Sequence, residues 1–156
     1  MIIKEVVSAW RVTLINDLDD NQILVTFKVV GTTFHQNEVD ELLMKAMPDF
    51  SYDENGQQEI VYNHSIDLVP EPYNQYDSNA VKVIFKAINQ PLHIGYLPKE
   101  FNWLYLKLSK ILTPVTSPSL KVIKREAICV GSNDDGTPRY EEFNDEFIGQ
   151  FVLQNK

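Results

Sequence analysis

The sequence has little of what secreted and membrane proteins need. Its single cysteine, Cys129, can form no intramolecular disulfide. No apolar run approaches the roughly 20 residues that a membrane-spanning helix requires, and the opening residues MIIKEVVSAWR lack the apolar stretch of a secretory signal. We therefore expect a cytoplasmic protein with no membrane partner. Because Cys129 lies in the apolar run 127–130, we expect its thiol to be buried in the core.

Patterns typical of catalysis and metal binding are also missing. The chain has no GxSxG nucleophile elbow, no HExxH zinc pattern and no P-loop. Its three histidines, His35, His64 and His93, are far apart in the sequence and far from Cys129, so no zinc-ligand spacing occurs. Although they remain free to meet in the fold, scattered histidines are the preferred interpretation. We expect a protein that is not an enzyme and that has no cofactor and no metal.

Charge is distributed unevenly along the chain. The net charge of −8 argues against a nucleic-acid partner. Between Val81 and Arg125, however, eight lysines and arginines stand against one acid, so this segment carries +7 and the remainder carries −15. Such asymmetry is a hint of a polyanionic partner. The alternative, a solvated basic face balanced by acids that lie nearby in space, stays open.

Periodicity predicts a mostly β protein with two helices, a β-rich α+β fold. Strand patterns occupy residues 9–15, 23–30, 59–69, 80–87, 92–97, 120–130 and 139–153. We expect the first two to form a hairpin. We expect the last two, joined by a turn at residues 131–136, to form a C-terminal hairpin that packs on the sheet or extends it.

The two predicted helices differ in their exposed faces. The first covers residues 37–47, with Asn37 as its cap and Pro48 as its stop. The second covers residues 99–112, with Pro98 at the first helical position. Its predicted core face consists of Phe101, Leu104, Leu108 and Ile111. Within an arc of roughly 80° on the opposite side lie Lys99, Trp103, Lys107 and Lys110. This basic stripe is either a solvated face or a binding surface.

Two motifs occur in order in the middle of the chain. Residues 68–83 read LVPEPYNQYDSNAVKV, and residues 94–100 read IGYLPKE. Together with residues 25–34, these motifs resemble the HIRAN domain family over about residues 23–112. The resemblance implies a small OB-like or SH3-like β-barrel in residues 1–112, including a helical insert near 37–47, followed by a linker and the C-terminal hairpin in residues 113–156. It also implies binding of single-stranded DNA, especially its 3′ end, in DNA repair or processing.

The resemblance assigns roles to individual residues. Asn74, Tyr76 and Asp77 match the turn that holds the terminal nucleotide, where Tyr76 would stack on a base and Asp77 would accept a hydrogen bond from the 3′-hydroxyl. Lys99 matches a lysine that contacts phosphate, and Phe34 matches a loop aromatic. The residues themselves add a further aromatic face and further positive charge nearby, on Tyr73, Tyr96, Lys82 and Lys86.

Structural interpretations of the same residues stay open. Asp77 and Asn79 are suited to holding the turn through hydrogen bonds to backbone amides, and Tyr76 is suited to a core position with its hydroxyl at the rim. Thr33 stands where the family member best known for DNA binding has a basic residue, and the loss of a phosphate contact weakens binding and flattens its salt dependence. The alternative function is therefore a protein-interaction module, with a protein partner, that has kept the fold and lost DNA binding.

Overall fold

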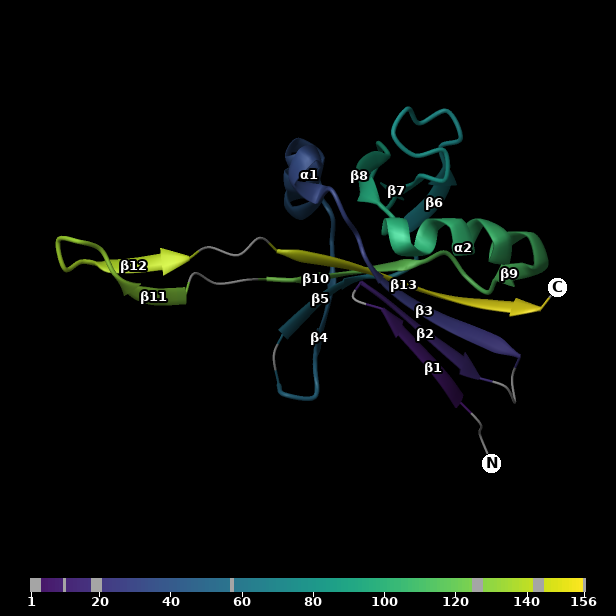
Figure 1. Cartoon of the computed structure of the whole chain (residues 1–156), viewed down its shortest axis with the longest axis horizontal. Coiled ribbons are helices and arrows are strands. Elements are labelled where there is room, and N and C mark those ends of the chain that lie inside the picture. The colour runs from purple at the N-terminus through teal and green to yellow at the C-terminus, as the bar shows by residue number, and fades with distance from the viewer. Residues whose placement is uncertain are drawn as a thin grey trace.

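The computed structural model describes residues 4–9, 11–17, 21–56, 58–124, 128–141 and 145–155. Over these ranges the chain is mostly β with two α-helices, as predicted (Figure 1). In chain order the elements are β1 (Lys4–Ala9), β2 (Val12–Asp17), β3 (Gln22–Lys28), the 3-10 turn η1 (Thr32–His35), α1 (Gln36–Lys45), β4 (Asp49–Tyr52), β5 (Gln58–Tyr62), β6 (Ile66–Pro70), β7 (Val81–Phe85), β8 (Leu92–Tyr96), α2 (Lys99–Ile111), β9 (Leu112–Pro114), β10 (Ser119–Ile123), β11 (Ile128–Ser132), β12 (Pro138–Glu141) and β13 (Glu146–Asn155).

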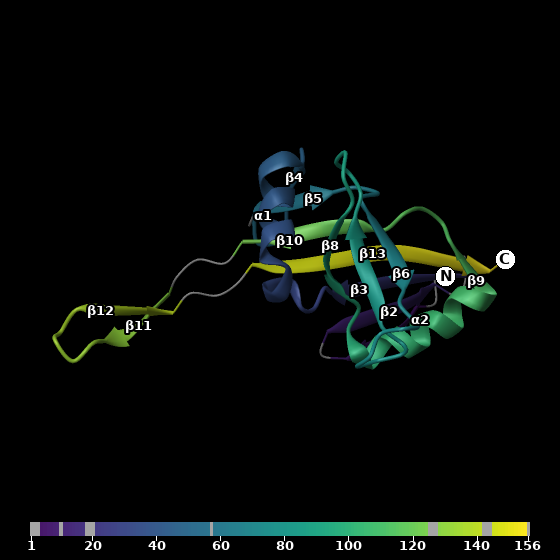
Figure 2. The same cartoon turned by 90° about the horizontal axis from the view of Figure 1, so that it is seen from above.

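Most of these strands belong to one long antiparallel sheet. Its order is β1-β2-β3-β13-β10-β5-β4, and β9 pairs with β13 beyond β10. The predicted N-terminal hairpin is present as the β2–β3 pair. A smaller sheet has the order β6-β7-β8, and β11 pairs with β12 in a hairpin that lies apart from both sheets (Figures 1 and 2). The small sheet and α2 carry the motifs singled out in the sequence.

The predicted closed barrel is wrong, because the described strands do not form a continuous hydrogen-bonded ring. At one end the two sheets are joined by a bridge in which Val30 and Tyr96 exchange backbone hydrogen bonds of 2.9 Å. At the other end the carbonyl of Pro118 accepts the amides of Ser65 and Ile66. Past that point a proline-rich segment faces β6, and proline cannot donate to a strand ladder. The kinship with OB-like and SH3-like folds stays a prediction.

Two predicted long strands are interrupted. The strand expected at 59–69 divides into β5 and β6, which lie in different sheets, because His64 adopts a left-handed conformation with φ of 51°. The strand expected at 139–153 divides into β12 and β13. The short strand β4 has no counterpart in the prediction, and the expected linker after residue 112 contains β9.

The C-terminal segment is integral to the large sheet. β13 pairs with β3 on one side and with β10 on the other. Gly149 faces the ring of Phe27 so closely that a Cβ atom would lie 2.1 Å from it. The predicted pairing of the last two strand regions is present in β10–β13 and β11–β12. The division of the chain at residue 112 stays a prediction.

The core lies between the two sheets and α2. Alternation along β7 buries Val81, Val83 and Phe85, as predicted. In α2, Phe101 is buried and Leu104 and Leu108 are partly buried. The prediction for Ile111 is wrong: its side chain is exposed, because the helix ends there and Leu112, in extended conformation, enters the core instead.

Three local predictions also need correction. Cys129 is exposed, because its apolar run belongs to the β11–β12 hairpin rather than to the core. The first helix begins at Gln36 and no side chain caps it, so Asn37 is not its cap. Pro98 precedes the first turn of α2, where its carbonyl accepts the amides of Phe101 and Asn102. Trp10, part of the first predicted strand, lies outside the described residues.

Candidate nucleic-acid interface

The turn between β6 and β7 is organised by the side chain of Asn74. Its Oδ1 accepts hydrogen bonds from the backbone amides of Tyr76 (2.9 Å) and Asp77 (3.0 Å). Its Nδ2 donates to Oε1 of Glu71 at 2.7 Å. One side chain therefore uses three hydrogen bonds to fix the conformation of residues 71–77, as asparagine commonly does in tight turns.

Asp77 anchors the same turn to helix α2. Its Oδ1 accepts the backbone amide of Asn79 at 2.9 Å, and its Oδ2 accepts Nδ2 of Asn102 at 2.8 Å. Asn102 is only 3% exposed, so the helix holds this amide firmly. The predicted hydrogen bond that Asp77 accepts from a backbone amide is confirmed. Each carboxylate oxygen has two lone pairs, so Asp77 retains the capacity to accept a further hydrogen bond.

Three aromatic side chains that the sequence singled out project into solvent. Tyr73 and Tyr76 are each 93% exposed, and Phe34, in η1, is 89% exposed. The interpretation of Tyr76 as a core aromatic is therefore wrong. Aromatic rings left in water on a fixed turn are available for stacking, and η1 packs against β8, beside the same sheet.

Glu71 connects the turn to the face of the small sheet. The hydroxyl of Tyr96 donates to its Oε1 at 3.1 Å, and Nζ of Lys82 lies 3.5 Å from its Oε2. The hydrogen bond from Asn74, followed by those from Tyr96 and Lys82, lowers the pKa of the Glu71 carboxyl despite partial desolvation. Desolvation and the same carboxylate raise the pKa of Tyr96. Glu71 is thus an anion stabilised by its hydrogen-bond partners, and Lys82 neutralises part of its charge.

Two histidines meet beside Tyr96, contrary to the preferred interpretation of scattered histidines. The ring centroids of His35 and His93 are 4.2 Å apart, and that of His93 lies 4.8 Å from the ring of Tyr96. Burial, and then the nearby His35, lower the pKa of His93. A bulge in the β7–β8 pairing accompanies this arrangement. No sequence signal reveals it, because it depends on the packing of η1 and α1 on β8.

The predicted lysines occupy different surroundings. Lys99 is exposed at the start of α2, three positions from Asn102, and no acid among the described residues lies within ion-pair distance of it. Lys86 lies at the far end of β7, about 13 Å along the strand from Lys82. Its Nζ is held by Asp67 (2.9 Å) and Ser117 (2.8 Å). The structure therefore places Lys82 and Lys99 near the turn, but not Lys86.

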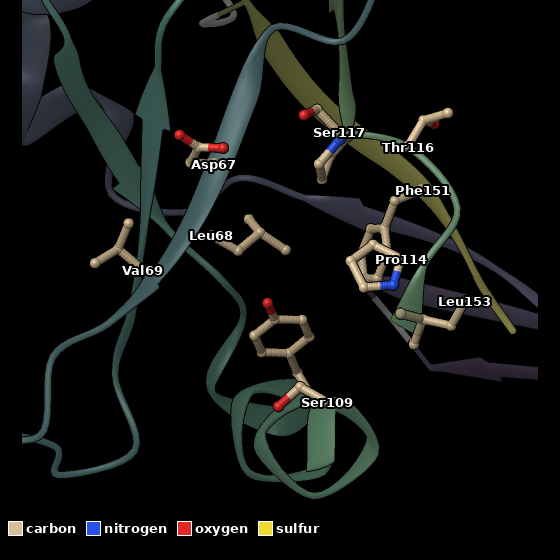
Figure 3. A pocket seen from close by; sticks show the side chains of 11 residues that line it. Asp67, Leu68, Val69, Ser109, Pro114, Thr116, Ser117, Phe151 and Leu153 are labelled. Carbon is tan, nitrogen blue, oxygen red and sulfur yellow. The ribbon is translucent and has the colours of Figure 1, made fainter. Parts of the chain in front are cut away.

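The surface also contains a pocket of about 470 Å³ between β6, α2 and the segment after β9. In Figure 3, Leu68 lies on one side, and Pro114, Phe151 and Leu153 lie on the other. Its remaining lining comes from Asp67, Val69, Tyr105, Ser109, Thr116, Ser117 and Pro118.

The described residues contain no cluster of three or more histidine, cysteine or acidic side chains suited to a metal ion. None of the helices described is long and apolar enough to cross a membrane.

Comparison with known proteins gives one match. The model of the family described as the HIRAN domain matches residues 23–152. It therefore extends beyond residue 112, where the sequence resemblance ended, and includes β10 to β13. No curated protein and no solved structure matches the chain. Since the match covers most of its length, the chain belongs to the HIRAN domain family, and this membership supports a nucleic-acid-binding module.

Proposed function

We propose that this chain is a non-catalytic domain that binds single-stranded DNA at its 3′ end. The observation that carries the proposal is the exposure of Tyr73 and Tyr76 on a turn fixed by Asn74 and Asp77. Stacking of a base on an aromatic side chain contributes about 1–3 kcal/mol. A turn that is already ordered loses little conformational entropy when a ligand binds.

Asp77 supports the choice of a strand end. A carboxylate repels phosphate, so it is unfavourable within a continuous backbone path, but it is a good acceptor for a hydroxyl. A 3′-terminal nucleotide presents such a hydroxyl. In this arrangement Tyr76 stacks on the terminal base, Asp77 accepts from its 3′-hydroxyl and Lys99 contacts a phosphate.

The electrostatics predict moderate affinity. Lys82 and Lys86 are paired with Glu71 and Asp67, and Thr33 supplies no charge. Each phosphate contact by a free lysine contributes about 0.7 to the slope of log affinity against log salt for a single strand. For a strand that reaches only this end site, we expect a small slope, set mainly by Lys99. A cytoplasmic role in the repair or processing of DNA ends is part of the same proposal.

The test is fluorescence anisotropy with 5′-labelled oligonucleotides that end in a 3′-hydroxyl or a 3′-phosphate. Wild-type protein should bind the oligonucleotide with the 3′-hydroxyl more tightly than the one with the 3′-phosphate. Asp77→Asn keeps an acceptor for the Asn79 amide, and it keeps the bond to the helix if the Asn102 amide rotates. The variant should therefore fold normally but lose most of the preference for the 3′-hydroxyl end. Asp67→Asn, which removes the same charge elsewhere, is the control.

The outcomes separate the parts of the proposal. If wild-type protein binds neither oligonucleotide at low salt, the DNA-binding proposal is wrong. If it binds both equally, recognition of the end is wrong. Lys99→Ala should weaken both ligands to a similar degree, because phosphate contacts carry no information about the terminal group.

A second candidate function, a protein-interaction module, is favoured by the edge of β6 beside the pocket. The amide of Glu71 donates to the carbonyl of Ala80, and the amide of Lys86 donates to the carbonyl of Ser65. In an antiparallel pair this pattern means that the odd-numbered residues of β6 direct their backbone hydrogen bonds to β7. The backbone of Leu68 therefore points to the opposite, open edge. A peptide strand that pairs there could insert a side chain into the pocket. Pull-down with and without nuclease distinguishes the two functions, since only a direct protein partner survives nuclease treatment.

A further inference from the structure

The exposed face of α2 combines positive charge with an aromatic ring. Lys99, Lys107 and Lys110 lie on this face with Trp103, whose side chain is 45% exposed. Nζ of Lys107 lies 5.2 Å from the centroid of the Trp103 ring, in a cation–π arrangement. The opposite side of the helix packs on the core through Phe101 and Tyr105, so the basic face points directly to solvent.

The acid in this helix does not weaken that face. Glu100 receives two hydrogen bonds from Arg11, one from Nε at 2.8 Å and one from Nη2 at 2.7 Å. This two-point ion pair satisfies the carboxylate, and the charge of Arg11 balances that of Glu100. The four positions of this face hold three lysines, one tryptophan and no acid, on a chain whose net charge is −8.

The same face begins at the proposed end-binding turn. Asn102, in the first turn of α2, donates to Asp77 at 2.8 Å, and Lys99 is the first residue of the helix. From Lys99 to Lys110 the helix advances about 16 Å. A stacked single strand advances about 3.4 Å per nucleotide, so this length corresponds to about five nucleotides, or fewer if the strand is extended.

We propose that the α2 face of Lys99, Trp103, Lys107 and Lys110 carries the strand on the 5′ side of the terminal nucleotide. The lysines contact phosphates at intervals along the strand, and Trp103 provides a stacking surface for an internal base. This inference rests on the proposed function, and it adds a second part to the binding surface that recognises the length of the strand rather than its end.

The experiment measures affinity as a function of length with 5′-labelled oligothymidylates of 3, 6 and 9 nucleotides that end in a 3′-hydroxyl. Wild-type affinity should rise at least tenfold between the shortest and the longest. Lys107→Ala/Lys110→Ala should bind the 3-mer as wild type does, weaken 9-mer binding severalfold, and lower the 9-mer salt slope by about 1.4, since two phosphate contacts are lost. Trp103→Ala should weaken only the longer strands, by about fivefold or more.

The control removes two positive charges elsewhere. Lys45, on α1, is paired with Glu41, and Lys121, on β10, is paired with Glu59 of β5. Lys45→Ala/Lys121→Ala should keep the length dependence. The inference is wrong, and end binding stands, if the 3-mer binds but affinity does not rise with length. It is also wrong if the control variant loses as much affinity for the 9-mer as the α2 variant does. If no oligonucleotide binds, the proposed function itself is wrong.

Discussion

Replacement of Asn74 by alanine tests whether the turn is ordered by its own side chains. The substitution removes a bond to the ionised Glu71 and two bonds from backbone amides. A hydrogen bond contributes about 0.5–1.5 kcal/mol, and one to a charged group about 1.5–3 kcal/mol. Because Asn74 is only half-buried, water replaces part of this loss, and we expect the free energy of unfolding to fall by about 1–3 kcal/mol.

Asn74→Ala should have two further effects. The hydrogen bond from Asn74 is the largest cause of the lowered pKa of Glu71, so this pKa should move back toward its ordinary value. Affinity for single-stranded DNA should also fall, because the aromatic side chains are no longer held in place. Urea denaturation measures the first effect, and NMR titration of the Glu71 carboxyl measures the pKa.

The matched control lies in the same turn. Asn79→Ala keeps the backbone amide that donates to Asp77, so stability should change by less than about 0.5 kcal/mol. The reasoning is refuted if Asn74→Ala unfolds at the wild-type urea concentration with an unchanged Glu71 pKa. It is also refuted if Asn79→Ala is as destabilising as Asn74→Ala.

Three other predictions follow from the same region. Gly95→Ala should cost about 1–3 kcal/mol in urea denaturation, because its Cβ would lie 2.4 Å from the carbonyl oxygen of Val30; a wild-type midpoint would contradict this. The lowered pKa of His93 means that the unfolded chain binds the proton first, so thermal stability should fall as the pH drops below about 6.5, and less so in His93→Gln. The lowered pKa of Glu71 means that its carboxylate stabilises the fold above about pH 4.5, and this contribution should disappear on further acidification. Glu71→Gln has no carboxyl to protonate, so its stability should lack this part of the pH dependence.

Local patterns predicted much of the fold. The alternation along β7 correctly placed Val81, Val83 and Phe85 in the core, and helical spacing correctly placed Phe101 there. The motifs correctly indicated the family. These properties depend on neighbours a few residues apart, so the sequence expresses them directly.

The predictions were wrong where the structure depends on contacts between segments that lie far apart in the sequence. The exposure of Cys129 depends on a hairpin that lies apart from the two sheets, and the absence of a closed ring among the described strands depends on where Pro118 meets β6. Likewise, no local pattern shows that Lys86 is neutralised by Asp67 or that His35 reaches His93. The motif residues of the candidate site were identified from the sequence, but their partners were not.

The central position of β13 has a consequence for how the molecule assembles. Lys28 pairs with Ile148, and β10 completes its pairing only with residues 146–150, so the middle of the large sheet is its most non-local part. Proteins dominated by such contacts fold slowly, typically in milliseconds to seconds. Until residues 146–155 emerge from the ribosome, β3 and β10 each lack a neighbour and present open, partly apolar edges, which are prone to aggregation. Truncation within β13 should therefore impair solubility during synthesis more than its few residues suggest.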